Sequence, residues 1–189
     1  MKVVVCSGNP GKIAELHPLF PEWELEPLAA GPLPPEDGDT YLDNARIKAR
    51  FGRDAVPTDR FVLADDSGIE VAALGGDPGV LTARWAGDAH VPKLLAALEG
   101  AADRRARYVC ELVLLAPGGA ETRGSGVLPG TVALTPSGTA GFGFDPIFVP
   151  DGESATVADL GDEWKTRRSH RALAAQALLT AVAGSGAPS

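Results

Sequence analysis

Two adjacent acids, Asp65 and Asp66, follow a run of apolar residues in the segment FVLADDSG, residues 61–68. Two neighbouring carboxylates at the end of a buried strand resist simultaneous ionisation unless solvent, hydrogen bonds or a cation relieves their repulsion. Mg²⁺ relieves it well, because this ion prefers hard oxygen ligands and is commonly held by one or two carboxylates together with substrate phosphates. For the segment alone, a turn in which the acids cap backbone amides is an equally good interpretation.

A phosphate-binding loop elsewhere in the chain favours the metal interpretation, and SGNPGK, residues 7–12, is the candidate. Its glycines allow backbone amides to approach an anion, the following helix start adds its dipole, and Lys12 adds a mobile positive charge. The spacing excludes a P-loop ATPase, since only two residues separate Gly8 from Gly11 and Ile13 replaces the hydroxyl residue that binds Mg²⁺. A plain strand-to-helix turn with a solvated lysine fits this segment equally well.

Two charged segments carry weaker signals. The segment EDGDTYLDNARIKAR, residues 36–50, places Asn44 and Lys48 one helical turn apart, so one helix face presents an amide and a cation together. Its acids otherwise suit a solvated helix start. The segment EWKTRRSHRAL, residues 163–173, gathers basic residues in an acidic chain, which indicates an anionic or carbonyl-bearing ligand, although such runs are usually solvated.

Aromatic residues among glycines mark a further candidate, SGTAGFGFDPIF, residues 137–148. Rings on flexible backbone can stack on a planar base while Asp145 reads the hydrogen-bonding edge of that base. Without other evidence, a glycine turn with core phenylalanines is the simpler interpretation.

Alternating strands and helices must position these segments. Short apolar runs predict buried strands at 2–6, 61–66 and 107–117, and a further strand at 124–134 that bends at Pro129 and Gly130. Helical spacing and prolines predict a short helix within 12–20, and a capping pattern predicts a second from Thr40 to Arg53. Further helices are expected at 91–98 and at the C-terminal end, where one stripe comprises Leu173, Ala177, Leu178 and Val182. This order predicts an α/β fold with a mixed sheet.

Composition narrows the class of protein. The chain has 189 residues, and we expect one folded domain over 1–183 with a disordered tail at 184–189. A formal charge of −8 leaves no broad basic face for a nucleic-acid polymer. Cys6 and Cys110 are the only cysteines, which argues against a disulfide framework or a structural zinc site. No apolar run suits a signal peptide or a membrane span, so we expect a cytoplasmic protein without a membrane partner.

Five segments, in this order, resemble the Ham1/RdgB-like inosine triphosphate pyrophosphatase family: SGNPGK, EDGDTYLDNARIKAR, ADDSGIEVAALGGDPG, GTAGFGFDP and SHRAL. The resemblance runs from about Lys2 to Val182. It implies a mixed central sheet flanked by helices, with the active site in a cleft between two lobes. It also implies a homodimer that uses Mg²⁺ to hydrolyse ITP, dITP and XTP to the nucleoside monophosphate and pyrophosphate.

The resemblance further implies roles for individual residues. Asp66 is the catalytic base and binds Mg²⁺ with Glu36, and Asp65 lies beside it as a third candidate ligand. Lys48 faces the phosphates and Ser67 lies in the substrate site. The triphosphate loop comprises Ser7, Gly8, Asn9, Pro10, Gly11 and Lys12, and the purine-reading residues are Phe142, Gly143, Phe144, Asp145, Lys165, His170 and Arg171.

The residue types suggest how such a site works. Glu36 and Asp66 hold Mg²⁺, which polarises the phosphates and orients a water that Asp66 deprotonates for attack on the α-phosphorus. Lys12 and Lys48 stabilise charge on the departing pyrophosphate. Arg171 or His170 donates to the 6-oxo group of hypoxanthine or xanthine, and an adenine amino group would leave such a donor unpaired.

The chain departs from the family pattern in three places. Asp43 stands where the family commonly has Glu, Phe144 stands where it usually has Tyr or Trp, and the region after 82–88 is shorter than in bacterial relatives. Two alternatives stay open: a non-catalytic purine nucleotide sensor, and a Maf-like nucleotide pyrophosphatase, whose first loop is typically Ser-Pro-Arg-Arg. The missing residue between Asp65 and Asp66 excludes the Asp-x-Asp motif of haloacid-dehalogenase-type phosphatases.

Overall fold

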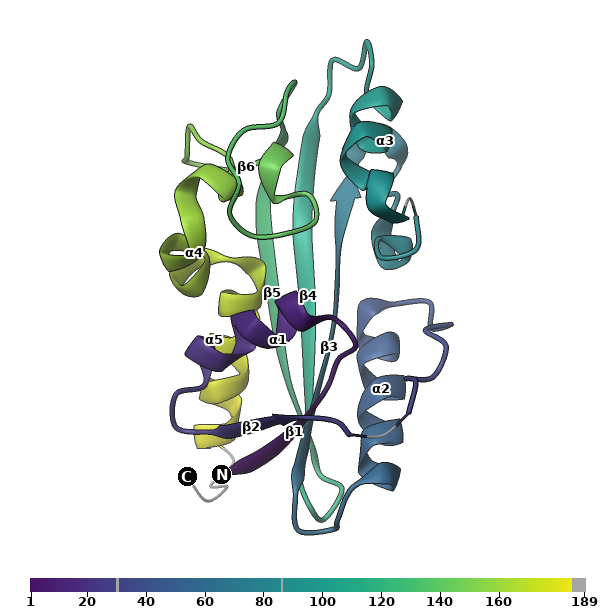
Figure 1. Ribbon diagram of the computed structural model, residues 1–189, viewed down its shortest axis with the longest axis vertical. Helices are drawn as coiled ribbons and strands as arrows, with labels where there is room; N and C mark the ends of the chain where they lie inside the picture. Colours follow the sequence, from purple (N-terminus) through teal and green to yellow (C-terminus); the bar gives the residue numbers. More distant parts are fainter. Residues whose placement is uncertain (30, 86, 185–189) are drawn as a thin grey trace. The chain divides into compact units, whose positions relative to one another are not determined.

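The computed structural model describes residues 1–29, 31–85 and 87–184, and the chain forms two compact units (Figure 1). The first unit comprises Met1–Asp66, Cys110–Gly126 and the chain from Arg171 onward, and the second comprises Ser67–Val109 and Val127–His170. The expectation of one domain over 1–183 stays a prediction. The predicted tail lies outside the described residues, apart from Gly184, which ends a helix.

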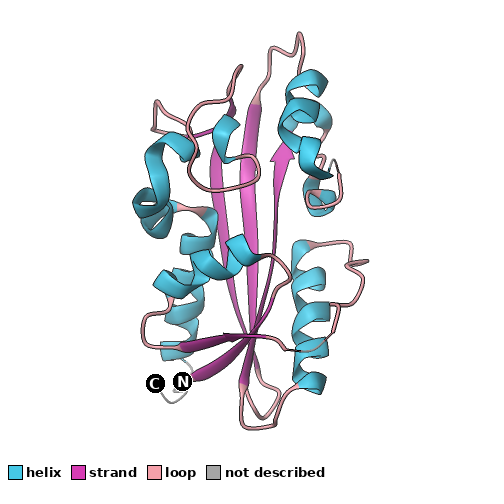
Figure 2. Ribbon diagram, in the orientation of Figure 1, coloured by secondary structure: helices cyan, strands magenta, loops and turns pink. Residues whose placement is uncertain are grey.

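Six strands form one sheet in the order β2-β1-β3-β4-β5-β6. Figure 2 draws the strands in magenta and the helices in cyan. β1 is parallel to β2 and β3, whereas β5 and β6 are antiparallel, so the sheet is mixed and the predicted α/β class is confirmed. The strands are β1 (Lys2–Cys6), β2 (Glu24–Pro27), β3 (Phe61–Val71), β4 (Arg105–Leu115), β5 (Glu121–Val132) and β6 (Phe148–Pro150). The helices are α1 (Pro10–Leu16), α2 (Tyr41–Ala55), α3 (His90–Ala97), α4 (Val157–Arg168) and α5 (His170–Gly184).

In the first unit, β1 is buried on both faces. Its residues Val3–Cys6 are all buried, and successive side chains of a strand point to opposite faces. Val3 and Val5 belong to one core cluster with Leu16 of α1 and Leu178 of α5. Cys6 belongs to a second cluster with two alanines of α2. A short, continuous apolar run is the sequence pattern of such a strand.

Two glycines of this unit allow helices to lie close to the sheet. A Cβ atom at Gly52 of α2 would collide with the sulfur of Cys6. A Cβ atom at Gly124 of β5 would lie 2.6 Å from the backbone nitrogen of Leu178 in α5. Real Cβ atoms do not approach other atoms so closely, so both positions require glycine while the neighbouring elements stay in place.

The second unit has its own apolar core. One buried cluster contains Leu94 of α3, Val157 of α4 and Tyr108 of β4. It also contains Phe148, the first residue of β6, and Phe144, which lies four residues earlier. The phenol ring of Tyr108 lies 4.2 Å from the ring of Phe148. Within the described ranges, no helix is long and apolar enough to span a bilayer.

Local signals predicted several elements correctly. The strand at 2–6 has the predicted bounds, and Thr40 caps α2 by accepting a hydrogen bond from the Asp43 amide at 3.1 Å. The helix expected within 12–20 is α1, which begins earlier because the Asn9 side chain accepts from the Gly11 and Lys12 amides.

The expected bounds of two strands were wrong, and three further elements were not predicted. β3 does not end at the acids: it continues to Val71, so Asp65 and Asp66 lie inside the strand. β5 begins at Glu121, earlier than expected, and ends at Val132, and it pairs with β6 from Gly130 to Val132. The expected bend at Pro129 and Gly130 stays a prediction. β2, β6 and α4 were not predicted, because the strands are short and α4 is polar with a non-helical Gly161 inside it.

Candidate functional site

The two acids of β3 have different partners. Asp65 forms two ion pairs through Oδ2, with Lys12 at 3.0 Å and with Arg171 at 3.4 Å. Asp66 accepts a hydrogen bond from Asn44 at 3.0 Å at Oδ2 and lies 3.5 Å from the Lys48 ammonium through Oδ1. Neighbouring residues of a strand point to opposite faces, and this alternation separates the two carboxylates.

Electrostatics also distinguishes the two acids. Burial disfavours the charge of Asp65, but Lys12 and Arg171 outweigh burial and hold the pKa of this carboxyl well below its usual range. Burial raises the pKa of Asp66, and the nearby Lys48 and Lys12 offset it only in part. Asp65 is therefore a firmly ionised group, whereas Asp66 is the more basic of the two.

Lys48 links Asp66 to the candidate metal ligand Glu36. Its ammonium lies 2.5 Å from Glu36 Oε1 and is almost fully buried. Burial lowers the pKa of Lys48, but Asp65, Asp66 and Glu36 together outweigh burial and raise it. Glu36 and Asp66 thus face one ammonium group, and the Mg²⁺ site assigned to these two carboxylates stays a prediction.

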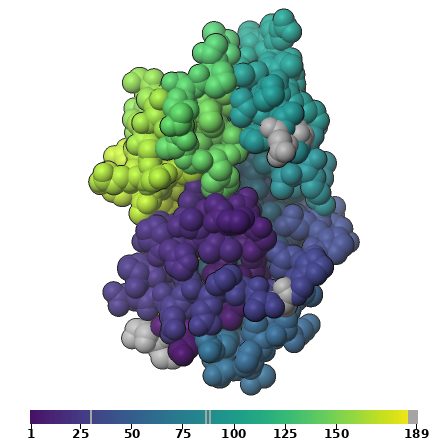
Figure 3. Space-filling model, viewed as in Figure 1, coloured from purple at the N-terminus to yellow at the C-terminus, as the bar shows by residue number. Residues whose placement is uncertain are grey.

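The loop predicted to bind the triphosphate, residues 7–12, is accessible. Gly8, Asn9 and Pro10 are exposed, and the N-terminal segment, drawn in purple, lies at the visible surface in Figure 3. Ser7 accepts a hydrogen bond from the Asn9 amide at 3.3 Å, and Lys12 extends from the loop to Asp65. The predicted loop therefore carries one of the cations that hold Asp65 ionised.

The second unit contains most of the predicted purine-reading residues. Asp145 is buried and its Oδ2 accepts from the Lys165 ammonium at 2.6 Å and from the Phe142 amide at 2.9 Å. Its Oδ1 accepts from the Tyr108 hydroxyl at 3.3 Å, and the imidazole of His170 stacks on the Tyr108 ring with centroids 4.7 Å apart. These contacts hold Asp145 inside the loop.

The two phenylalanines of this loop differ in exposure. Phe142 is 36% exposed and the Lys165 ammonium lies 4.8 Å from the centre of its ring. Phe144 is buried in the core of the unit, where its ring meets His90 edge-on at 5.1 Å. Gly143, which lies between them, has a positive φ of 64° and its carbonyl lies 2.8 Å from His90 Nε2. Phe142 is thus the ring that can be reached from solvent.

Arg171 does not belong to the same compact unit as the other predicted purine-reading residues. Arg171 belongs to the first unit, is 1% exposed and pairs with Glu15 as well as with Asp65. His170, the preceding residue, belongs to the second unit. Ser67 is half-buried in β3 directly after Asp66.

Several residues of these clusters were not among the predicted site residues. Their side chains contact predicted residues, and they are Glu15, Asn44, His90 and Tyr108. Only Asn44 had a usable signal, which was its position one helical turn before Lys48.

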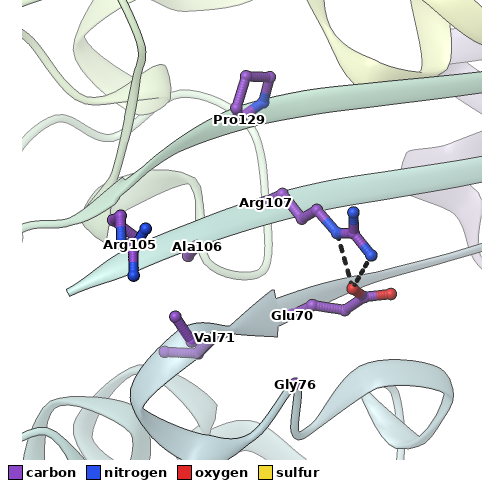
Figure 4. Close-up of a pocket in the computed structure, with 8 residues that line it drawn as sticks. Glu70, Val71, Gly76, Arg105, Ala106, Arg107 and Pro129 are labelled. Carbon is purple, nitrogen blue, oxygen red and sulfur yellow. Dashed lines mark hydrogen bonds and ion pairs between the residues drawn. The ribbon is translucent and has the colours of Figure 1, made fainter. Parts of the chain in front are cut away.

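A separate hollow of about 280 Å³ lies in the second unit, near the end of β3 and the start of β4 (Figure 4). Arg107 donates from Nε to Glu70 Oε2 at 2.7 Å beside it. None of the predicted site residues lines the hollow, whose walls comprise Glu70, Val71, Ala72, Gly76, Arg105, Ala106, Arg107 and Pro129.

In the described part of the chain, no three His, Cys, Asp or Glu side chains lie close enough together to hold a metal ion. Mg²⁺ does not need such a cage, because it keeps several waters and often takes one or two carboxylates with substrate phosphates. The pair formed by Glu36 and Asp66 supplies the right kind of oxygen ligand for that mode of binding.

Comparison with known proteins identifies the family of the chain. The model of the Ham1 family matches residues 3–181. A dITP/XTP pyrophosphatase of Bdellovibrio bacteriovorus is 40% identical over 95% of this chain and 96% of its own length. One from Thermus thermophilus is 43% identical over 96% of this chain and 91% of its own length.

Solved structures give the same result. The Staphylococcus aureus Ham1 protein has a TM-score of 0.85 and 34% identity over 98% of this chain and 100% of its own. A HAM1 protein from Coxiella burnetii has a TM-score of 0.84 and 36% identity over 97% of this chain and 99% of its own. The family match covers nearly the whole chain, and the chain therefore belongs to the Ham1 family.

Proposed function

We propose that this protein hydrolyses dITP, ITP and XTP to the nucleoside monophosphate and pyrophosphate. The observation that carries the proposal is identity of 40% or more, over nearly the full length, with proteins named dITP/XTP pyrophosphatases. The chemistry of the first unit supports it, because that unit combines a glycine-containing loop, two lysines and paired carboxylates, as phosphate transfer to water requires.

We infer that Glu36 and Asp66 hold Mg²⁺ when the substrate binds. The donor set fits this ion, since both groups offer hard carboxylate oxygens and both already face the Lys48 ammonium. When bound, the ion polarises the phosphates of the substrate. Asp65, the third ligand implied by the resemblance, has Lys12 and Arg171 as its partners, so we assign it to the placement of Lys12.

Asp66 is the proposed proton acceptor for the attacking water. A carboxylate with a raised pKa is a better base at neutral pH than an ordinary one, and burial gives Asp66 that property. The proton of the water goes to an Asp66 oxygen as the water oxygen attacks the α-phosphorus and pyrophosphate leaves. Lys12 and Lys48 stabilise the negative charge on the departing group.

The purine is assigned to the residues of the second unit. Lys165 and His170 supply donors for the 6-oxo group of hypoxanthine or xanthine, and the exposed ring of Phe142 supplies a surface on which a base stacks. An adenine amino group would leave those donors without an acceptor, which penalises ATP. Asp145 holds the loop through Phe142 and Lys165.

Other implications of the resemblance stay proposals. They are the purine contacts of Gly143, Phe144 and Arg171, a substrate contact of Ser67, an active site in a cleft between two lobes, a homodimer and a cytoplasmic location. The formal charge of −8 supports the expectation that no nucleic-acid polymer is a partner.

The test is a panel of nucleoside triphosphates, incubated with the protein and Mg²⁺ and analysed separately for pyrophosphate and orthophosphate. We expect pyrophosphate from ITP, dITP and XTP and little from ATP and GTP. Orthophosphate as the direct product, or equal turnover of ATP, would refute the proposal. Binding of ITP in calorimetry without turnover would instead favour a nucleotide sensor, and preference for another base would favour a Maf-like enzyme.

A further inference from the structure

We propose that Asn44 is a positioning residue, which ties the loop carrying Glu36 to Asp66 and so sets the spacing of these two carboxylates. The inference rests on the proposed function, in which Glu36 and Asp66 act together. It concerns a residue that contacts neither phosphate nor metal in that scheme and acts through its neighbours.

The hydrogen bonds of one amide group carry the inference. Asn44 lies on α2 with no exposed surface. Its Oδ1 accepts from the backbone amide of Gly38 at 2.9 Å, and its Nδ2 donates to Asp66 Oδ2 at 3.0 Å. If the amide were reversed, its Nδ2 would face the Gly38 N–H and its Oδ1 would face the Asp66 carboxylate, so neither hydrogen bond could form. The two partners therefore fix the orientation of the amide.

Lys48 completes the connection from the next turn of α2. Residues four apart lie on the same helix face, and Lys48 lies 3.5 Å from the other oxygen of Asp66 and 2.5 Å from Glu36. Both oxygens of Asp66 and the loop before α2 are therefore attached to one rigid helix. A helix holds such groups more accurately than a loop does.

The approach of the loop to α2 is close enough to be sensitive to one added carbon atom. A Cβ atom at Gly38 would lie 2.7 Å from Asp43 Cβ and 2.9 Å from Asn44 Oδ1. The loop would have to move away from the helix to admit that atom. Glu36 precedes Gly38 by two residues, so a displaced loop carries the Glu36 backbone with it.

A purely structural role makes a different prediction from a positioning role. If Asn44 only satisfied buried polar groups, its loss would lower stability and leave Mg²⁺ affinity unchanged. Thr40 provides the matched control, because it caps the same helix through the Asp43 amide and contacts neither Glu36 nor Asp66 through the hydrogen bonds of the structure. Thr40→Ala removes support from the start of α2 without removing the amide link.

The experiment compares the wild type with Asn44→Ala, Gly38→Ala, the double variant and Thr40→Ala. Hydrogen exchange of the metal-free proteins measures protection over residues 36–39. Pyrophosphate release from dITP, titrated with Mg²⁺, measures the Mg²⁺ concentration at half-maximal rate. Groups that orient a metal ligand typically change metal affinity by about 10- to 100-fold when they are removed.

We expect Asn44→Ala and Gly38→Ala each to speed exchange over 36–39 and to raise the half-maximal Mg²⁺ concentration by about 10-fold or more. The double variant should be no worse than the more affected single variant, because both changes break one link. Thr40→Ala should lower the unfolding temperature and leave the Mg²⁺ requirement within about threefold of the wild type.

Two results would overturn the inference while the wild type is active: an Asn44→Ala protein whose Mg²⁺ requirement matches that of Thr40→Ala, or unchanged exchange over 36–39. If Asn44→Ala fails to fold, Gly38→Ala alone carries the test. A wild type that releases no pyrophosphate from dITP would refute the proposed function itself, and the positioning role with it.

Discussion

Replacement of Arg171 by Met removes a buried cation from between two carboxylates. Arg171 pairs with Glu15 and with Asp65 Oδ2, and its side chain is 1% exposed. Met has a similar length and no charge, so the substitution removes the charge without leaving a large void. We expect a marked loss of stability, because removal of one partner leaves an uncompensated buried charge.

The contacts of Asp65 and Glu15 indicate how large the loss of unfolding free energy should be. Removal of one partner of a buried pair costs about 3–5 kcal/mol. Asp65 keeps Lys12 at 3.0 Å, and Glu15 is 17% exposed and can turn toward water, so we expect about 3 kcal/mol in the free energy of unfolding. At about 2–4 °C per kcal/mol for a protein of this size, the melting temperature falls by roughly 6–12 °C.

The assay is urea denaturation at pH 7, followed by circular dichroism. Arg167→Met is the matched control, since Arg167 is 65% exposed and forms an ion pair with Glu163, which lies four residues earlier in α4. That exposed pair is worth about 0.5 kcal/mol or less. Adding Asp65→Asn to Arg171→Met should restore part of the lost stability, because the amide removes a buried charge that has lost one of its two cations.

The pH dependence supplies an independent check. The pKa of Asp65 is lowered in the folded protein, so its stabilising effect is present above the ordinary carboxyl pKa and is lost as the pH falls below it. Arg171→Met should weaken that loss on acidification. Asp66, whose pKa is raised, contributes with the opposite sign but is common to both proteins. A variant within 1 kcal/mol of the wild type at pH 7, or with the same acid sensitivity, would refute the reasoning.

Three more predictions concern single sites. Asp66→Asn should abolish dITP turnover in a steady-state assay and keep the circular dichroism spectrum, since the amide cannot accept the proton; retained activity would remove Asp66 from the role of base. Gly124→Ala should cost about 1–3 kcal/mol in urea denaturation because its Cβ meets α5, whereas Gly118→Ala, in open space, should be neutral; equal values would contradict the packing argument. Burial raises the pKa of Cys6 and Cys110 to about 12, so a thiol reagent at pH 8 should label both only after unfolding, as mass spectrometry would show.

Much of the fold follows from neighbouring residues in the sequence. The apolar run at 2–6 becomes β1 with the predicted bounds, and Thr40 caps α2 as the spacing to Asp43 indicates. These signals are local, because a capping hydrogen bond or a turn involves residues a few positions apart. β2 was missed because four residues are too few to show a period.

The order of the five motifs was also enough to indicate the family and the residue types of the site, including the pairing of Asn44 and Lys48 on one helix face. The sequence did not indicate residues that contact predicted site residues but lie far from them along the chain. Glu15 reaches Arg171 across 156 positions of the chain, and Tyr108 reaches Asp145 across 37 positions. No pattern of neighbouring residues encodes such contacts.

The sequence by itself determined which acids and cations were available, whereas the tertiary structure decided which of them meet. Asp65 and Asp66 are adjacent in the chain, yet the alternation of side chains within β3 directs one to Lys12 and the other to Lys48. His170 and Arg171 are also adjacent and belong to different compact units. The physical reason is that a strand turns successive side chains to opposite faces, and only the packed helices determine what each face contains.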